Sequence, residues 1–306
     1  MKKRVGLIGL GDIAQKVYLP LLSVHEQVDI VGIMSTSPIT VKKLQEKYHI
    51  PLGTSKVDQL LQQDLDAIFV HSPTETHYAI VKECITRGID VYVDKPLSYE
   101  WMESVELSLL AEKKGVLLAV GFNRRYAPLY CEAKRWMQDA GGFDWCSAVK
   151  HRVKQQKHSF KQTMYDDLIH ILDILLWLGE ESCEVHGHQH KIDQEGRMLH
   201  TSGNVSFGEA TGSYSMVRLA GIDIEKLELH GGGRSVEVTN LETAIFYEHG
   251  VMPRTRSYGS WDSLLMRRGF EGIIDHFLQS IDNPQECNIR ADLVLESHRL
   301  VERLSL

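Results

Sequence analysis

Cysteine is scarce in this sequence. The 306 residues include five cysteines, which are scattered along the chain and form no C-x-x-C pair. This pattern argues against a disulfide framework and predicts reduced, mostly structural thiols. The chain also lacks an apolar run long enough to cross a membrane, and no apolar segment or cleavage site follows the N-terminal Met-Lys-Lys-Arg. We therefore expect a cytoplasmic protein without a membrane partner.

An excess of positive charge is lacking as well. Lysine and arginine number 34 against 41 aspartates and glutamates, and the formal net charge is −7. This balance argues against nucleic acid as the main partner, although it leaves room for a local basic site. At 306 residues the chain is long for one hydrophobic core, so we expect two domains of unequal character.

What the sequence does contain, near its N-terminus, is a glycine turn. Residues 4–14 read as a buried strand, a tight turn and a helix, and Gly9 and Gly11 allow backbone angles that a Cβ forbids. Such a turn leaves N–H groups at a helix N-terminus, where the helix dipole favours a phosphate, although many α/β proteins use one simply to turn. Ala14 replaces the third glycine of the dinucleotide-binding fingerprint, whose main role is close packing. The residues predicted to hold a pyrophosphate are Gly9, Gly11, Asp12 and Ile13.

Two further apolar runs, at residues 28–33 and 66–70, alternate with helical segments. This alternation is what a doubly wound parallel sheet requires. We therefore predict an α/β Rossmann domain that binds a dinucleotide over residues 1–122. The boundary is placed near Asn123, where the composition changes character.

Residues 123–306 are predicted to form an α+β domain for substrate binding and oligomerisation. Strand-like runs follow one another with short turns, which implies a largely antiparallel open sheet. We expect a long helix at residues 165–178 and two closing helices near 262–281 and 291–304, the last helices being able to pack back on the first domain. Because an exposed antiparallel sheet commonly pairs with its copy, we expect a homodimer or homotetramer. The predicted strands are 184–192, 198–207, 212–220, 224–231 and 235–239.

A carboxylate is absent where the second strand ends. In NAD-dependent Rossmann domains an acid at this point binds the ribose hydroxyls. Here Ser35 and Thr36 occupy the position, and with Lys42 and Lys43 in the next helix they suit the 2′-phosphate of NADP. The alternative is that Ser37 caps that helix and the lysines form a solvated face. We favour NADP among the NAD(P) cofactors.

Polar residues also follow the third apolar strand. In an open α/β sheet the carboxyl ends of the strands border the ligand crevice. We therefore expect this segment to face a bound dinucleotide. For the histidine at its end the residues alone favour a satisfied surface position. The residues predicted at this point are Ser72, Pro73, Thr74 and His77.

The next strand runs directly into Asp94-Lys95-Pro96. Adjacent strand residues point to opposite faces, so Asp94 and Lys95 do not simply neutralise each other. A lysine at the carboxyl end of a strand is a good proton donor or alkoxide stabiliser, because burial readily lowers the pKa of an ammonium. The alternative is an exposed turn, in which Asp, Lys and Pro are common.

A helix of the second domain carries Asp166, His170 and Asp173 at positions i, i+4 and i+7, which places them on one face. A carboxylate one turn from an imidazole can fix its tautomer and orient it as a base. Geometry alone favours a solvated stripe over catalysis. A metal site would need further ligands that the sequence does not identify, and we predict no metal.

Three histidines, His186, His188 and His190, alternate along a predicted strand and should share a face. Same-face neighbours lie about 7 Å apart, which is too far for all three to bind one ion comfortably. We interpret them as a polar sheet face.

Four motifs occur together in order. They are Val5-Gly6-Leu7-Ile8-Gly9-Leu10-Gly11, Ser72-Pro73-Thr74-Glu75-Thr76-His77, Asp94-Lys95-Pro96 and Gly121-Phe122-Asn123-Arg124-Arg125. In order and spacing the chain resembles the Gfo/Idh/MocA family of nicotinamide-dependent oxidoreductases, and its MviM-like branch in particular. It departs from the family at Asp94, where Glu is usual, and at residues 159–164, which replace a glycine-rich run.

The resemblance implies a dehydrogenase or reductase that acts on a hydroxyl or carbonyl group of a sugar, polyol or related small molecule lying between the domains. Asp166 and His170 match the family's Asp-x-x-x-His. His170, oriented by Asp166, would remove the hydroxyl proton, and Lys95 would stabilise the alkoxide. The nicotinamide would lie near Pro73, Asp94 and Lys95. Further residues expected to hold cofactor or substrate oxygens are Asn123 for the cofactor and Arg124 and Tyr165 for the substrate.

Two other functions remain open at this point. Some members of the family use a tightly held nicotinamide for transient oxidation during glycoside hydrolysis. A non-catalytic nucleotide-binding regulator is the second alternative, given the departures at Ala14 and Asp94.

Overall fold

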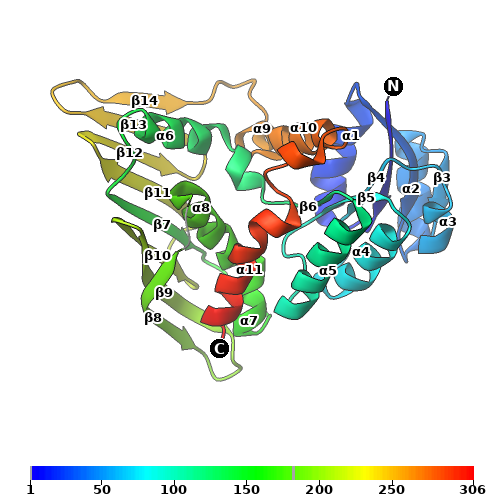
Figure 1. The fold of residues 1–306 in the computed structure, drawn as a ribbon, viewed down its shortest axis with the longest axis horizontal. Helices are drawn as coiled ribbons and strands as arrows, with labels where there is room; N and C mark the ends of the chain where they lie inside the picture. The colour runs from blue at the N-terminus through cyan, green and yellow to red at the C-terminus, as the bar shows by residue number, and fades with distance from the viewer. Residues whose placement is uncertain (1, 181–182) are drawn as a thin grey trace. The chain divides into compact units, whose positions relative to one another are not determined.

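The computed structural model describes residues 2–180 and 183–306. Its chain forms two compact units, each with its own sheet (Figure 1). The first unit comprises the chain up to Phe122 together with Ile273–Leu295. The second comprises Asn123–Gly272 and Glu296–Leu306.

A six-stranded sheet forms the centre of the first unit. In sheet order its strands are β3 (Leu52–Thr54), β2 (Val28–Met34), β1 (Lys3–Ile8), β4 (Ala67–Val70), β5 (Asp90–Val93) and β6 (Leu118–Val120). All neighbouring pairs are parallel. The strand order changes direction between β1 and β4, so their carboxyl ends border a topological switch point. The predicted doubly wound parallel sheet is confirmed.

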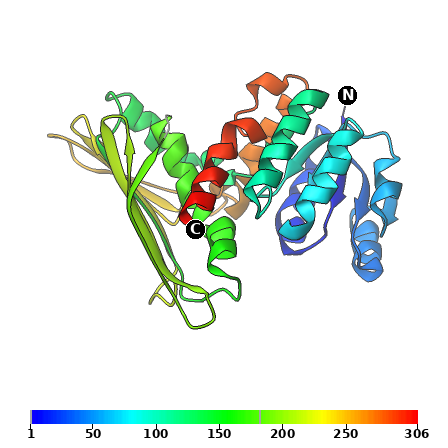
Figure 2. The ribbon, with the colours of Figure 1, turned by 60° about the horizontal axis from the view of Figure 1, so that its bottom comes forward.

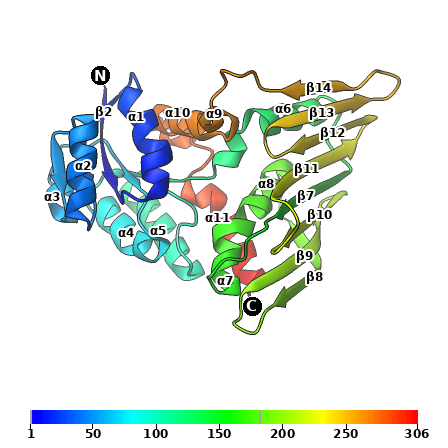
Figure 3. The same cartoon turned by 180° about the vertical axis from the view of Figure 1, so that it is seen from behind.

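Helices pack around this sheet. α1 (Leu19–Val24) contacts β2, and α4 (His77–Thr86) contacts β4 and β5. α10 (Phe270–Ser280), from far along the chain, lies beside α1 in Figures 1 and 3, and His25 Nε2 and Asp275 Oδ1 are 2.9 Å apart. The other helical segments are η1 (Ala14–Tyr18), α2 (Pro38–Tyr48), α3 (Val57–Leu61), η2 (Thr74–Thr76), α5 (Trp101–Lys114) and η5 (Pro284–Glu286).

The second unit contains an eight-stranded sheet. In sheet order the strands are β14 (Arg254–Ser257), β13 (Thr243–Glu248), β12 (Arg234–Thr239), β11 (Ile224–Gly231), β7 (Trp145–His151), β10 (Ala210–Val217), β9 (Met198–Phe207) and β8 (Glu184–Ile192). Every neighbouring pair is antiparallel except β7 with β10. The prediction of a largely antiparallel sheet is confirmed. β7, β13 and β14 were not among the predicted strands.

Two helices lie against one face of this sheet, as Figure 2 shows. α6 (Pro128–Gln138) packs on β11, β12 and β13, and α8 (Ile169–Gly179) packs on β7 and β10. The other helical segments are η3 (Asn123–Tyr126), α7 (Phe160–Thr163), η4 (Met164–Leu168), α9 (Leu264–Arg267) and α11 (Ala291–Leu304), whose residues from Glu296 belong to this unit. No helix of the described chain combines the length and apolar character needed to cross a membrane.

The helix predicted at 165–178 is interrupted in its first turns. η4 is a π-helical segment that leads into α8, and α7 precedes it. The α7 turn begins with a capping box, in which the Ser159 hydroxyl accepts from the Gln162 N–H at 3.3 Å while the Gln162 side chain accepts from the Ser159 N–H at 3.2 Å. The segment that lacks the family's glycines is therefore an ordered helix start.

The closing helix predicted at 262–281 is two helices. Gly269 lies between α9 and α10 with φ +79°, and a Cβ on it would come within 2.6 Å of the Ala127 nitrogen. This backbone conformation is one that α-helices do not contain. The apolar pattern of the sequence continues across Gly269, but the helix itself is interrupted at this residue.

The prediction that His186, His188 and His190 share a face is wrong. β8 contains a bulge after His186, where Gly187 adopts φ +59°. An extra residue reverses the alternation of side chains beyond it. His186 Nε2 therefore lies 3.0 Å from Ser206 Oγ, whereas His188 Nδ1 lies 2.7 Å from the hydroxyl of buried Tyr214.

Phe277 of α10 should be a main source of stability in the first unit. Its ring makes edge-to-face contacts with Phe69 and Tyr92, at centroid distances of 5.3 and 5.4 Å. We expect Phe277→Ala to lower the free energy of unfolding by about 3–5 kcal/mol, because a buried aromatic ring is replaced by a cavity. Leu109→Ala, at an exposed site on α5, should change it by less than about 0.5 kcal/mol. Urea denaturation measures both, and equal losses would contradict the assignment.

Candidate functional site

The glycine turn joins β1 to the first helical segment, and its geometry requires Gly9. Gly9 has φ +89°, and a Cβ on it would overlap the backbone of Ser72, whose Cα lies only 2.6 Å from that position. The Gly9 N–H also donates to the Met34 carbonyl at 2.9 Å. This residue thus brings the carboxyl ends of β1, β2 and β4 together, and no residue with a side chain fits the approach.

Gly11 faces open space instead. Beyond its chain neighbours, no atom of the described residues lies within 4 Å of the position that its Cβ would take. Gly11 and Asp12 are exposed where the helix begins, and exposed N–H groups at a helix start suit a phosphate. A dinucleotide pyrophosphate fits this turn, and Gly9, Gly11, Asp12 and Ile13 are the residues that would hold it.

The end of β2 has the two features of the alternative considered for it, a capped helix and a solvated lysine face. Ser37 caps α2, because its hydroxyl accepts from the Thr40 N–H at 3.3 Å. Lys42 is exposed and lies 4.0 Å from Glu46, as on a solvated helix face. Ser35 is half-buried and Thr36 is exposed. These two hydroxyls remain the groups at this strand end that suit a ribose or its phosphate.

His77 is buried rather than a surface histidine, with 1% of its area exposed. Its Nδ1 lies 2.9 Å from the Pro96 carbonyl and its Nε2 lies 2.9 Å from the Ser72 carbonyl. Burial lowers the pKa of the imidazole, although the Pro96 carbonyl and Asp94 oppose this. His77 therefore links the connection after β4 to the one after β5. The surface alternative for His77 is wrong.

Asp94 occupies a buried hydrogen-bond network at the end of β5. Its Oδ2 lies 2.8 Å from His71 Nδ1, and its Oδ1 accepts from the Tyr18 hydroxyl at 3.0 Å. The Tyr18 and Tyr92 hydroxyls are 2.8 Å apart, and the Tyr18 ring stacks on His71 at 3.8 Å. Burial alone would raise the pKa of Asp94, but the charge and hydrogen bond of His71 outweigh it, so the pKa lies below its ordinary value. Half-buried Lys95 follows directly.

Sequence reasoning did not include Tyr18, His71 or Tyr92 in this site. A signal for two of them was present. Tyr92 and His71 place polar atoms in or next to strands whose other residues are apolar and buried, apart from half-buried Asp90 at the start of β5. A buried polar group needs a hydrogen-bond partner, and Asp94 lies two residues after Tyr92, where the same strand ends.

In the second unit, the structure places several predicted residues in buried contacts. Asn123 Nδ2 donates to the Arg268 carbonyl at 2.7 Å, and the Tyr165 hydroxyl donates to Glu302 at 2.8 Å. Arg124 forms a two-pronged pair with Glu225, at 2.5 and 3.0 Å. Their roles toward cofactor and substrate stay predictions.

The helix predicted to carry a base holds its acidic residues in different surroundings. His170 is buried in α8, and Asp166 is half-buried in η4. Asp173 is buried, forms a two-pronged pair with Arg125 at 2.6 and 2.9 Å, and accepts from Ser297 at 2.8 Å. Asp173 therefore has a structural role in the second unit.

Asp167, which the sequence analysis did not single out, is the centre of a buried charge cluster. It forms ion pairs with Lys150 of β7 and with Arg218, which follows β10. Burial and the nearby Arg124 lower the pKa of Lys150 to about 7, although Asp167 and Glu225 oppose them. The signal in the sequence was Lys150 itself, which shares the inward face of its strand with Cys146 and Ala148.

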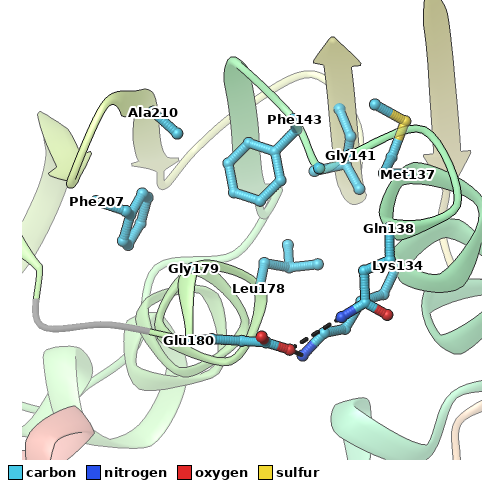
Figure 4. Close-up of a pocket in the computed structure, with 12 residues that line it drawn as sticks. Lys134, Met137, Gln138, Gly141, Phe143, Leu178, Gly179, Glu180, Phe207 and Ala210 are labelled. Atoms are coloured by element: carbon cyan, nitrogen blue, oxygen red, sulfur yellow. Dashed lines mark hydrogen bonds and ion pairs between the residues drawn. The ribbon is translucent and has the colours of Figure 1, made fainter. Parts of the chain in front are cut away.

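A separate pocket of about 380 Å³ also lies within the second unit (Figure 4). Its polar side chains already pair with one another, since Lys134 Nζ and Gln138 Nε2 lie 2.7 and 3.0 Å from Glu180 Oε1. Apolar side chains, including Phe143 and Phe207, form much of the rest. None of the predicted site residues lines this pocket, and we assign it no role in the chemistry.

Comparison with known proteins accounts for the combination of a dinucleotide turn and a second α+β unit. A family described as an oxidoreductase family with an NAD-binding Rossmann fold, GFO_IDH_MocA, matches residues 3–122, and a YceM-like C-terminal domain matches residues 128–249. YceM of Salmonella typhimurium, which is named as an oxidoreductase, is 32% identical over 98% of this chain and 96% of its own. The chain belongs to the Gfo/Idh/MocA family of oxidoreductases.

This Gfo/Idh/MocA protein is also similar to two dehydrogenases. The crystal structure of a dehydrogenase, MviM, from Clostridium difficile superimposes with a TM-score of 0.93 and 33% identity, covering 99% of this chain and 98% of that one. The predicted likeness to the MviM branch is thereby confirmed. An NAD-dependent scyllo-inositol 2-dehydrogenase of Bacillus subtilis is 30% identical over 60% of this chain and 55% of its own.

Lys150 should give this Gfo/Idh/MocA protein a measurable pH dependence. Its pKa is about 7 in the folded state and about 10.4 in an unfolded chain. Between these values the unfolded state holds a proton that the folded state lacks, so the free energy of unfolding should rise with pH across this window. Urea denaturation from pH 7 to 10 should show a smaller rise for Lys150→Met than for the wild type.

Lys42→Met is the matched control, because Lys42 is exposed. It should keep the wild-type dependence on pH. If Lys150→Met also kept it, the lowered pKa of Lys150 would be wrong.

Proposed function

We propose that this protein transfers a hydride between a nicotinamide dinucleotide and a carbon that bears a hydroxyl or carbonyl group in a sugar, polyol or related small molecule. The observation that carries the proposal is the arrangement at the carboxyl ends of the parallel strands. A turn with room for a pyrophosphate lies after β1, and Lys95 follows a carboxylate held by His71 and Tyr18 after β5. A relative named as an inositol dehydrogenase supports the substrate class.

Lys95, Asp166 and His170 are the residues that we propose for the chemistry. In the direction of alcohol oxidation, His170, oriented by Asp166, accepts the hydroxyl proton, and Lys95 stabilises the developing alkoxide. A bound nicotinamide would supply the acceptor for the hydride. The buried network around Asp94 supports the role of Lys95, because it fixes the backbone from which this side chain extends.

NADP is our proposal for the preferred cofactor. Ser35 and Thr36 provide hydroxyls at the end of β2, and no carboxylate lies between residues 34 and 38. A carboxylate at this position would repel a 2′-phosphate, and its replacement by hydroxyls supports NADP over NAD. We also propose a cytoplasmic enzyme, in keeping with its five free cysteines.

We further propose that the enzyme is a homodimer or homotetramer formed through the sheet of the second unit. β7 and its neighbours carry half-exposed residues on one side, including Trp145, which is 40% exposed. Large exposed aromatic rings are more frequent at subunit contacts than on free surfaces.

Gly11→Ala tests the cofactor site. Because open space surrounds Gly11 and its φ lies outside the left-handed region, the substitution should leave stability within about 1 kcal/mol of the wild type. The added methyl would lie where the pyrophosphate approaches the backbone, so we expect the dissociation constant for NADPH to rise at least about tenfold, or about 1.4 kcal/mol. Fluorescence titration with NADPH and NADH measures it.

Gly221→Ala is the matched control, since Gly221 also faces open space without a positive φ. It should bind NADPH as the wild type does. Unchanged binding by Gly11→Ala, or absence of binding to wild-type protein freed of retained nucleotide, would contradict the proposed cofactor site.

Lys95→Ala and His170→Ala test the proposed chemistry. Each should lower kcat by about 10²- to 10⁴-fold, because each removes a group that handles the proton or the alkoxide. The assay follows absorbance at 340 nm with NADP⁺ or NAD⁺ and a panel that includes scyllo-inositol, myo-inositol and D-glucose. If the two groups act in one step, the double variant should lose far less than the product of the single losses. Full turnover in both single variants would exclude the assignment.

A further inference from the structure

The charge cluster on the sheet of the second unit contains more cations than carboxylates. Among the ion pairs of the described residues, the carboxylates of the cluster are Asp167 and Glu225. Four basic side chains pair with them in the described chain: Lys150, Arg218, Arg124 and Arg152. Even if Lys150 is uncharged, three guanidinium groups face two carboxylates. This excess of positive charge, part of it on Arg152, whose side chain is 23% exposed, favours the binding of an anion.

The strand order brings this cluster together beside the helix that carries His170. β7 lies between β10 and β11, and Lys150 pairs in register with Glu225. Arg218 comes directly after β10, and its backbone forms an isolated parallel β-bridge with that of Arg152. α8 packs on β7 and β10. The basic groups and the proposed base therefore lie on one side of one sheet.

Arg218 differs from Arg124 in how much of its hydrogen-bonding capacity is used. Arg124 donates hydrogen bonds to Glu225 from both its Nε and an Nη. Arg218 gives an Nη to Asp167, but its buried Nε has no hydrogen-bond partner among the described residues. A guanidinium fork binds carboxylate or phosphate through two parallel N–H groups, so an unused Nε is a place for a second acceptor oxygen.

We propose that the substrate carries a carboxylate or phosphate group and that Arg218, assisted by Lys150, binds it. This inference rests on the proposed function, since it names the class of compound on which the enzyme acts. Asp167 orients both basic groups from its two oxygens. At the edge of the cluster, 23% of the Arg152 side chain is exposed. A carboxylate or phosphate would supply both an acceptor for the Arg218 Nε and a counter-charge, whereas a polyol hydroxyl would supply only the acceptor, so the site favours the anion.

Direct binding tests this inference separately from turnover. The probes are D-glucose, D-glucuronate and D-glucose 6-phosphate, which share a ring and differ in charge, and calorimetry measures their binding to the enzyme saturated with NADPH. We expect at least one anionic compound to bind at least tenfold more tightly than D-glucose. The glucuronate and phosphate experiments separate the two anionic groups.

Arg218→Met should reduce this preference to less than twofold, and Arg218→Lys should retain only part of it, because lysine keeps the charge without the fork. Arg299→Met is the control, since Arg299 is exposed and pairs with Glu296 on α11. It should keep the wild-type preference. Circular dichroism shows which variants are folded. If Arg218→Met is not folded, Arg218→Lys is used to test the anion preference.

Equal binding of all three compounds, or an anion preference that survives in folded Arg218 variants, would overturn the inference. Neither result bears on hydride transfer, which the 340 nm assay measures independently. Conversely, anion binding that depends on Arg218 in a protein that oxidises no compound would support the anion site and contradict the proposed function.

Discussion

The carboxylate of Asp94 is the constraint on which the functional edge of the first unit depends. Its side chain is only 19% exposed, and an ion largely withdrawn from water is tolerated only where hydrogen bonds and an opposite charge replace the water. His71, after β4, and Tyr18, before α1, supply these partners. One side chain thereby connects three segments that are far apart in sequence, and the contact of His77 with the Pro96 carbonyl links a fourth segment, α4, to them. The backbone at Lys95 is held from both sides as a result.

This arrangement explains why the shorter side chain of aspartate is suitable at position 94. The family usually has a longer acid at this position, and in this chain the carboxylate lies within 3.0 Å of both His71 and Tyr18. The stacking of Tyr18 on His71 brings both donors to the same point. The replacement is thus part of a closed network of hydrogen bonds.

Much of this structure was predictable because its signals are local. The glycine turn, the apolar parallel strands and the strands β8, β9 and β11 follow from patterns within a few residues. Edge strand β14 was missed because its four residues are all exposed and polar. The face of the β8 histidines was assigned wrongly because one left-handed glycine, Gly187, reverses the alternation.

The charge cluster of the second unit was not predictable in the same way. Asp167 meets Lys150 and Arg218, and Arg218 lies 51 residues along the chain from it. The contact depends on β7 lying between two strands that follow it by more than 50 residues in the sequence. Alternation within β7 places Lys150 on one face with Cys146 and Ala148, but the strand order that supplies its partners arises only from the complete sheet.

The π-helical segment η4 has a consequence for how proteins of this family are aligned. A π turn holds about one residue more than an α turn, so it changes which of two neighbours is directed at the sheet. In this chain adjacent aspartates occupy the segment, and Asp167 is the one that pairs with Lys150 and Arg218. A relative with an ordinary α turn could present the same carboxylate from a different sequence column. Equivalent residues in this segment are therefore better matched by superposition than by counting along the chain.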